Sequence, residues 1–210
     1  MIKAAEVFRI LEHTHQLTML EQFSSYTPFQ LLVMTLLSSR TRDATTIPMM
    51  PGLFRKYPTP GEFLEVPLAT LKKDLYGIGF YRVKAENIKK LSQMVLEKYH
   101  GKIPDSFEEL TSLPGVGRKT ANCILNYAFK KPAIAVDVHV HRIANRLGWV
   151  KTKTPEETEF ALQKLLLPEQ WGKVNMLFVD HGQRICLPWN PKCGVCPMVK
   201  WCEFGRGRSM

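Results

Sequence analysis

Hydrophobic residues recur with a helical period along most of the chain. The spacing predicts one helix that opens at Thr27-Pro28, where proline takes the tolerated first position, and another that ends at Gly101. The apolar residues that mark these two helices are Phe29, Leu32, Val33, Leu36 and Leu37 in the first, and Val83, Ile88, Leu91, Val95 and Tyr99 in the second.

Start signals predict two further helices. Asp105 with Glu108 has the spacing of a capping box, and Thr154-Pro155 with Glu157 opens a helix that runs through Leu165 and Leu166. The prolines of residues 47–60 predict a kinked connector there. No segment alternates like a strand, and residues 133–136 are too short to change the picture. The sequence therefore predicts an all-α protein.

A short glycine motif occurs twice. The residues L-x-G-I-G at 75–79 echo L-P-G-V-G at 113–117, and each motif lies between two helical segments. The repeat predicts two helix–turn–helix pairs.

The second motif has the features of a phosphate site. Gly115 and Gly117 permit positive φ and remove Cβ atoms, so that a ligand can approach the backbone. The next helix presents N–H groups and a positive dipole end, and Arg118 and Lys119 follow at once. A P-loop is excluded, because its spacing is not met. Two interpretations stay open: a clamp for the DNA backbone, or a plain tight turn between helices.

Charge favours a polyanionic partner. The net charge is +10, and residues 111–155 hold eight bases and one acid, Asp137. The longest apolar run, residues 31–37, is too short for a membrane span, and the first residues lack the apolar core of a signal peptide. We expect an intracellular protein that binds nucleic acid rather than a membrane.

Four cysteines predict a metal centre. They have the spacing C-x6-C-x2-C-x5-C and comprise Cys186, Cys193, Cys196 and Cys202, whereas Cys123 stands alone. Tetrahedral zinc usually takes two short cysteine pairs, and only one is present here. The wider outer loops suit an iron–sulfur cubane better, but the spacing leaves zinc open.

Lys119 and Asp137 are candidates for chemistry at a sugar carbon. A helix N-terminus and a cationic neighbour both disfavour the ammonium form of Lys119 and favour a nucleophilic amine. Asp137 is the nearby carboxylate that would stabilise positive charge on the sugar. The simpler alternatives are a phosphate contact for Lys119 and a helix N-cap for Asp137.

These motifs together resemble the endonuclease III branch of the helix-hairpin-helix DNA glycosylases. The resemblance rests on LPGVGRKTAN (113–122), AVDVHVHRIANRLG (135–148), LLSSRTRD (36–43), GIGFYRVKAENI (77–88) and the cysteine run. It implies a six-helix barrel domain at 21–131, with the helix-hairpin-helix at about 105–128. It also implies a [4Fe-4S] lobe formed by residues 1–20 and 132–210.

The resemblance implies a monomeric, bifunctional DNA glycosylase/AP lyase. Such an enzyme removes damaged, above all oxidised, pyrimidines from double-stranded DNA and nicks the abasic site by β-elimination. Lys119 matches the Schiff-base lysine and Asp137 the essential aspartate, and the cluster ligands carry over onto the four cysteines.

Arg40 and Phe80 match the two loop residues that fill the stack after a base leaves it. The usual occupants are glutamine and leucine, so both residues depart from the pattern, and Arg40 is suited to read an orphaned guanine. Lys192 belongs to a cluster loop that is less basic than usual.

Two rival functions stay open at this point. A monofunctional glycosylase of the same fold would act on uracil or thymine opposite guanine. A non-catalytic iron–sulfur DNA-binding protein would need the basic face and the cysteines without the pair Lys119 and Asp137.

Overall fold

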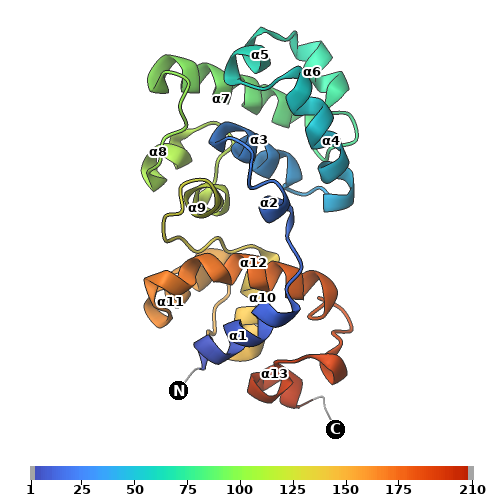
Figure 1. Cartoon of the computed structure of the whole chain (residues 1–210), viewed down its shortest axis with the longest axis vertical. Coiled ribbons are helices and arrows are strands. Elements are labelled where there is room, and N and C mark those ends of the chain that lie inside the picture. Colours follow the sequence, from blue (N-terminus) through green and yellow to red (C-terminus); the bar gives the residue numbers. More distant parts are fainter. Residues whose placement is uncertain (1–2, 208–210) are drawn as a thin grey trace. The chain divides into compact units, whose positions relative to one another are not determined.

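The computed structural model describes residues 3–207, and these residues form helices without a strand (Figure 1). The predicted all-α class is confirmed. None of the described helices is long and apolar enough to cross a membrane. In chain order the helices are α1 (Ala4–Thr14), α2 (Met19–Gln22), α3 (Pro28–Ser38), α4 (Asp43–Lys56), α5 (Pro60–Glu65), α6 (Leu68–Asp74), α7 (Tyr81–Tyr99), α8 (Phe107–Ser112), α9 (Arg118–Tyr127), α10 (Val138–Leu147), α11 (Pro155–Leu165), α12 (Pro168–Arg184), the short 3₁₀ turns η1 (Cys193–Val195) and η2 (Val199–Trp201), and α13 (Glu203–Arg206).

The chain divides into two compact units. The hairpin unit is Gln22–Lys130, and the cysteine unit joins Met1–Glu21 to Lys131–Met210. The division lies close to the domain boundaries expected from the sequence. The assignment of these units as a barrel domain and a cluster lobe stays a prediction.

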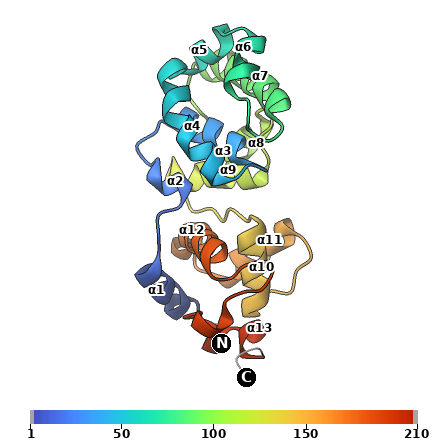
Figure 2. The same cartoon turned by 90° about the vertical axis from the view of Figure 1, so that its right-hand side faces the viewer.

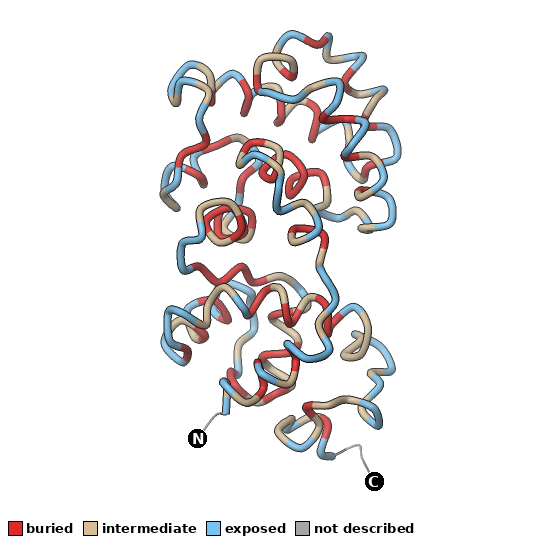
Figure 3. Tube along the Cα trace, in the orientation of Figure 1, coloured by how far each residue is buried: buried red, intermediate tan, exposed pale blue. Residues whose placement is uncertain are grey.

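Helix α3 is the central helix of the hairpin unit. Thr27 caps it in a full capping box with Gln30, and Pro28 is its first residue, as predicted. It packs against α4, α7 and α9, and Figure 2 shows it among the helices of this unit. The apolar residues expected to mark this helix are buried, and Leu31 and Met34 are buried as well. Figure 3 shows buried segments inside this unit. A helix that is apolar all round is a core helix.

Residues 47–60 do not form the predicted connector. Helix α4 runs through Pro48 and Pro51, and only the residues after Lys56 leave it. Both prolines lie on the exposed side, where water can hydrate the carbonyls that they leave without an N–H donor. Burial of Met50 and Phe54 on the opposite side holds the helix together.

The repeated glycine motifs form two corresponding turns, as predicted. One joins α6 to α7 and the other joins α8 to α9. In each turn the first glycine has positive φ, +98° at Gly77 and +81° at Gly115. Each turn also closes with a backbone bond back to its leucine, from Ile78 to Leu75 and from Val116 to Leu113.

The helix start that was placed at Asp105 and Glu108 is wrong by one residue. Ser106 is the N-cap of α8, and its hydroxyl accepts from the amide of Glu109. The Glu109 side chain in turn accepts from the Ser106 hydroxyl. The start predicted at Thr154 is confirmed, with Thr154 and Glu157 forming a capping box.

The cysteine unit has its own core. Helix α12 packs against α1 and α10, so the first helix of the chain contacts a helix from its C-terminal half. Three aromatic rings stack edge-on or tilted at its centre: Phe8 and Trp149 lie 5.6 Å apart, and Trp149 and Phe178 lie 5.5 Å apart. Packing against α12 fixes the position of α10, the helix that begins directly after Asp137.

Candidate functional site

The turn at 113–117 delivers the N-terminus of α9 to the surface of the hairpin unit. Position 115 favours glycine, because its φ is positive and a Cβ there would lie 3.0 Å from Asn87 Nδ2. Gly117 does not use the positive φ that glycine permits: its φ is −99°, and a Cβ there would meet no atom of the described residues within 4 Å. Gly117 offers no side chain to cap the first turn of α9. The backbone at this end can therefore be approached closely.

Lys119 is the second residue of α9 and is half-buried. The helix is anchored behind it, because α9 packs against α3 and α8 and buries Ala121, Cys123 and Ile124. Arg118 lies one position earlier, with its guanidinium 4.6 Å from the ring centre of Phe107. The predicted location of Lys119 in the first turn is confirmed.

Asp137 is the N-cap of α10 in the cysteine unit. Its Oδ1 accepts hydrogen bonds from the amides of His139 and Val140, each at 2.9 Å. Among the described residues no hydrogen bond reaches Oδ2. One oxygen of the carboxylate thus accepts from the amides at the N-terminus of α10, while the lone pairs of the other oxygen stay available to a ligand.

Two polar side chains, buried Asn175 and half-buried Arg142, hold the chain around Asp137. Asn175 donates to the carbonyl of Ala135 at 2.9 Å and so fixes the buried segment before Asp137. Arg142 donates to the carbonyls of Gly182 and Cys186 and lies one turn along α10. These residues position the carboxylate.

Arg40 and Phe80 occupy neighbouring loops of the hairpin unit. Arg40 follows α3 and Phe80 caps α7, and the guanidinium of Arg40 lies 5.5 Å from the centre of the Phe80 ring. Phe80 is 62% exposed, so it is not a core residue. Together with Val83 and Gly115, both side chains line a hollow of about 240 Å³.

The sequence reasoning missed Lys84. Val83 is 55% exposed and does not belong to the buried stripe of α7. Lys84 takes that place, because positions 84, 88, 91 and 95 share one helix face. The helical spacing already places residue 84 on the buried face of α7. Because a charged side chain is rarely buried, the sequence instead favours Val83 at this place.

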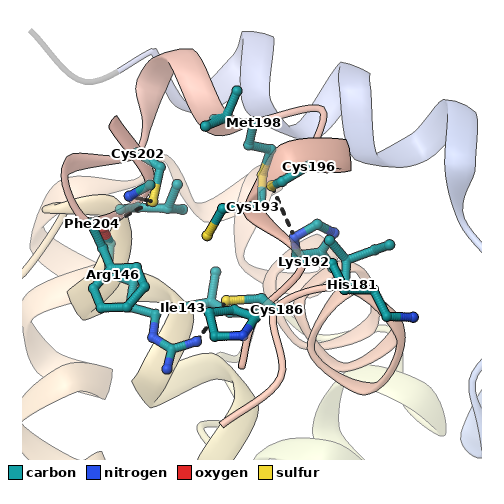
Figure 4. A pocket seen from close by; sticks show the side chains of 15 residues that line it. Ile143, Arg146, His181, Cys186, Lys192, Cys193, Cys196, Met198, Cys202 and Phe204 are labelled. Atoms are coloured by element: carbon teal, nitrogen blue, oxygen red, sulfur yellow. Dashed lines mark hydrogen bonds between the residues drawn. The ribbon is translucent and has the colours of Figure 1, made fainter. Parts of the chain in front are cut away.

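The four cysteines line one pocket of the cysteine unit (Figure 4). None of them forms a disulfide, and Figure 4 shows their sulfur atoms turned toward the same space. Ile143, Leu147 and Met198 supply an apolar lining. Within residues 3–207 no group of three or more His, Cys, Asp or Glu side chains has an arrangement that could hold a metal ion. The sulfurs surround a space rather than a point.

A guanidinium group and an imidazole nitrogen approach these sulfurs. Arg146 donates to Cys186 Sγ at 3.3 Å, and His181 Nε2 lies 3.6 Å from Cys196 Sγ. Burial lowers the pKa of His181 to about 4 and raises the pKa of Cys196 to about 11. Lys192 also lines this pocket and is exposed.

The sequence-predicted residues form three groups, and Asp137 belongs to none of them. Arg40, Phe80 and Gly115 share one hollow, and Arg118 and Lys119 share the first turn of α9. The four cysteines share their pocket with Lys192. Asp137 belongs to the cysteine unit and Lys119 to the hairpin unit.

A helical hairpin that precedes a lysine-bearing helix, in the same chain as a helical unit with four clustered cysteines, defines a class of DNA repair proteins. The model of the HhH-GPD superfamily of base excision DNA repair proteins matches residues 33–168. That range includes the hairpin, Lys119 and Asp137, and the cysteines follow it.

Comparison with individual proteins narrows this class to one family. The chain is 55% identical to an endonuclease III from Thermotoga maritima over 87% of this chain and 85% of that protein. It is 42% identical to an endonuclease III from Bacillus subtilis over 87% of this chain and 84% of that protein. A solved structure of a trapped covalent endonuclease III–DNA intermediate superposes with a TM-score of 0.86 at 35% identity and covers all of both chains.

The chain belongs to the endonuclease III family. The resemblance predicted from its motifs is confirmed. Membership makes the protein a DNA N-glycosylase with AP lyase activity, rather than a non-enzymatic iron–sulfur protein.

Proposed function

We propose that this protein binds double-stranded DNA, excises damaged pyrimidines and then nicks the strand through a Schiff base on Lys119. The observation that carries the proposal is the position of Lys119, in the first turn of α9 directly after the glycine turn. The backbone amides of this turn would bind a phosphate, and the amine beside them would then lie next to the sugar of that nucleotide. A related solved structure, a trapped covalent endonuclease III–DNA intermediate, supports the same chemistry.

Phe80 and Arg40 are suited to the step before chemistry. An extruded base leaves a gap in the stack, and an exposed aromatic ring can fill it by stacking. Arg40 carries five N–H donors beside that ring, which fit the O6 and N7 acceptors of an orphaned guanine. We assign these two residues to the separation of the bases.

In the chemical step, the neutral amine of Lys119 attacks C1′, and the bond from C1′ to the base nitrogen breaks with its electron pair leaving on the base, which takes up the proton that the amine gives up. The C1′–O4′ bond then opens, O4′ takes a proton from water, and the nitrogen of Lys119 forms a protonated imine with C1′. Asp137 Oδ2 stabilises the positive charge that develops on the sugar, while Oδ1 stays with the amides of α10. Loss of a C2′ proton from the resulting imine then expels the 3′ phosphate, and water releases Lys119. The hydroxide left when O4′ takes its proton accepts the proton lost from C2′.

We assign a [4Fe-4S] cluster to Cys186, Cys193, Cys196 and Cys202. Four free thiols around one apolar space fit a cluster better than a single ion, and Arg146 would neutralise part of its charge. The bound cluster would hold the loops of the cysteine unit together. In this assignment residues 22–130 are the barrel domain and residues 131–210 with 1–21 the cluster lobe. Intracellular action and a monomeric state stay predictions.

The cluster assignment has a direct chemical test. Protein purified without oxygen should contain about four irons and four acid-labile sulfides per chain. Cys196→Ser should lower both contents and destabilise the cysteine unit, whereas Cys123→Ser should leave them unchanged because Cys123 is buried in the hairpin unit. One zinc per chain with no iron would contradict the assignment.

The function is tested with a duplex that carries one oxidised pyrimidine. We expect base release and a strand nick without alkali. A monofunctional mismatch glycosylase would release the base and leave the strand intact until alkali is added. That result, or preferential release of uracil or thymine opposite guanine, would contradict the proposal.

A further inference from the structure

The loops that carry Arg40 and Phe80 adopt a costly conformation. Arg40 has φ of 52° and Phe80 has φ of 57°, and a left-handed conformation costs a residue with a side chain about 1–2 kcal/mol. Such residues persist only where their surroundings hold them. Something in the hairpin unit must therefore hold both loops.

Lys84 supplies contacts to the first loop from the helix of the second. It lies on α7, one turn after Phe80, and is only 8% exposed. Its ammonium donates to the carbonyls of Leu37 at 2.9 Å and Ser39 at 2.5 Å. These carbonyls belong to the C-terminal end of α3, where the helix leaves its last carbonyls without amide partners and a cation is favoured.

Thr41 completes the connection. Its Oγ1 accepts from Lys84 Nζ at 3.2 Å and from the amide of Gly79 at 3.1 Å. A Cβ at Gly79 would lie 2.5 Å from the carbonyl oxygen of Arg40, so the backbones of the two loops meet where only glycine fits. Lys84 and Thr41 therefore join both loops to one frame.

We propose that Lys84 is a positioning residue that holds the Arg40 and Phe80 loops together as one preformed wedge. The proposal rests on the proposed function, because a wedge matters only to a protein that separates bases. Preformed loops do not have to be ordered at the moment of base extrusion, which lowers the cost of that step.

A phosphate contact is the plainer role for a lysine in a DNA-binding protein. It does not fit here, because the ammonium is buried and already donates to three oxygens. Burial lowers the pKa of Lys84 to about 8, because removal from water disfavours the charged form of the amine.

The test compares Lys84→Met with the pair Thr41→Val and Thr41→Ser. Lys84→Met keeps the aliphatic stem and removes the ammonium. Thr41→Val removes the hydroxyl that links the loops, whereas Thr41→Ser keeps it and is the matched control. Thermal unfolding shows that each protein is folded before its activity is compared.

Two readouts separate positioning from general stability. A duplex with a stable abasic analogue and 2-aminopurine in the opposite strand reports how far the wedge unstacks the bases. Single-turnover excision of an oxidised pyrimidine is compared with nicking of a preformed abasic site, where no base has to leave the stack. We expect Lys84→Met to lose most of the fluorescence rise and to excise about tenfold more slowly, since a charge-assisted hydrogen bond is involved. Nicking of the abasic site should change by less than about twofold.

The Thr41 pair decides the matter if Lys84→Met does not fold. Thr41→Val should lose fluorescence and excision in the same direction, and the amide of Gly79 should exchange faster in the free protein, while Thr41→Ser matches the wild type. Equal behaviour of Thr41→Val and Thr41→Ser would overturn the inference. So would a folded Lys84→Met with wild-type fluorescence, or equal losses on both substrates. A wild-type protein that neither excises nor nicks would instead overturn the proposed function.

Discussion

Lys119→Gln is expected to abolish strand nicking, by about 10³-fold or more, while retaining most of the affinity for DNA. Glutamine fits the second position of α9 and keeps a polar side chain, but its amide cannot form an imine with C1′. Nicking of a preformed abasic duplex and binding to the same duplex at several salt concentrations measure the two effects separately. If Lys119 only contacts a phosphate, binding should weaken modestly and nicking should persist at saturating protein.

Gly117→Ala is the matched contrast to this variant. Its φ of −99° suits alanine, and the added Cβ would lie within 4 Å of no atom in the described part of the chain, so the free energy of unfolding should change by less than about 1 kcal/mol. The methyl group would stand where we place a phosphate. Gly117→Ala should thus weaken binding to DNA, and nicking by this variant should return to the wild-type rate when the protein saturates the DNA. Gly115→Ala is less informative, because Gly115 has positive φ and lies against Asn87.

Asp137→Asn is expected to reduce base excision by about 10²–10⁴-fold with little loss of stability. Asparagine caps a helix nearly as well as aspartate, and its carbonyl oxygen can accept the two amide bonds that Oδ1 accepts now. The charge that faces the developing cation is lost. Nicking of a preformed abasic site should fall much less, because no base has to leave.

The control for this prediction is Asp137→Ala, which removes both the charge and the cap. It should excise as poorly as Asp137→Asn and also lower the free energy of unfolding by about 1 kcal/mol. Excision by Asp137→Asn at the wild-type rate would show that Asp137 is a helix cap and nothing more.

The helical framework was predictable because it follows from local signals. Thr27-Pro28 and Thr154-Pro155 carry their caps with them, and the repeated glycine turn has the same backbone pattern at Gly77 and Gly115. The position of Lys119 follows from the same turn. These features depend on neighbours in the sequence.

The errors occurred where tertiary packing decides. Pro48 and Pro51 signal a break, yet burial of the opposite face keeps α4 helical. Lys84 was missed because a buried lysine is stable only beside acceptors, and its acceptors lie more than forty residues earlier. The pairing of the Arg40 and Phe80 loops likewise depends on contacts that no local pattern contains.

The central claim is that Lys119 is the nucleophile. Borohydride reduction during turnover on a duplex with one oxidised pyrimidine should give a stable protein–DNA adduct, because the reagent reduces the imine. Digestion and mass spectrometry of that adduct should place the sugar remnant on Lys119. An adduct on another amine, or efficient trapping by Lys119→Gln, would contradict the account.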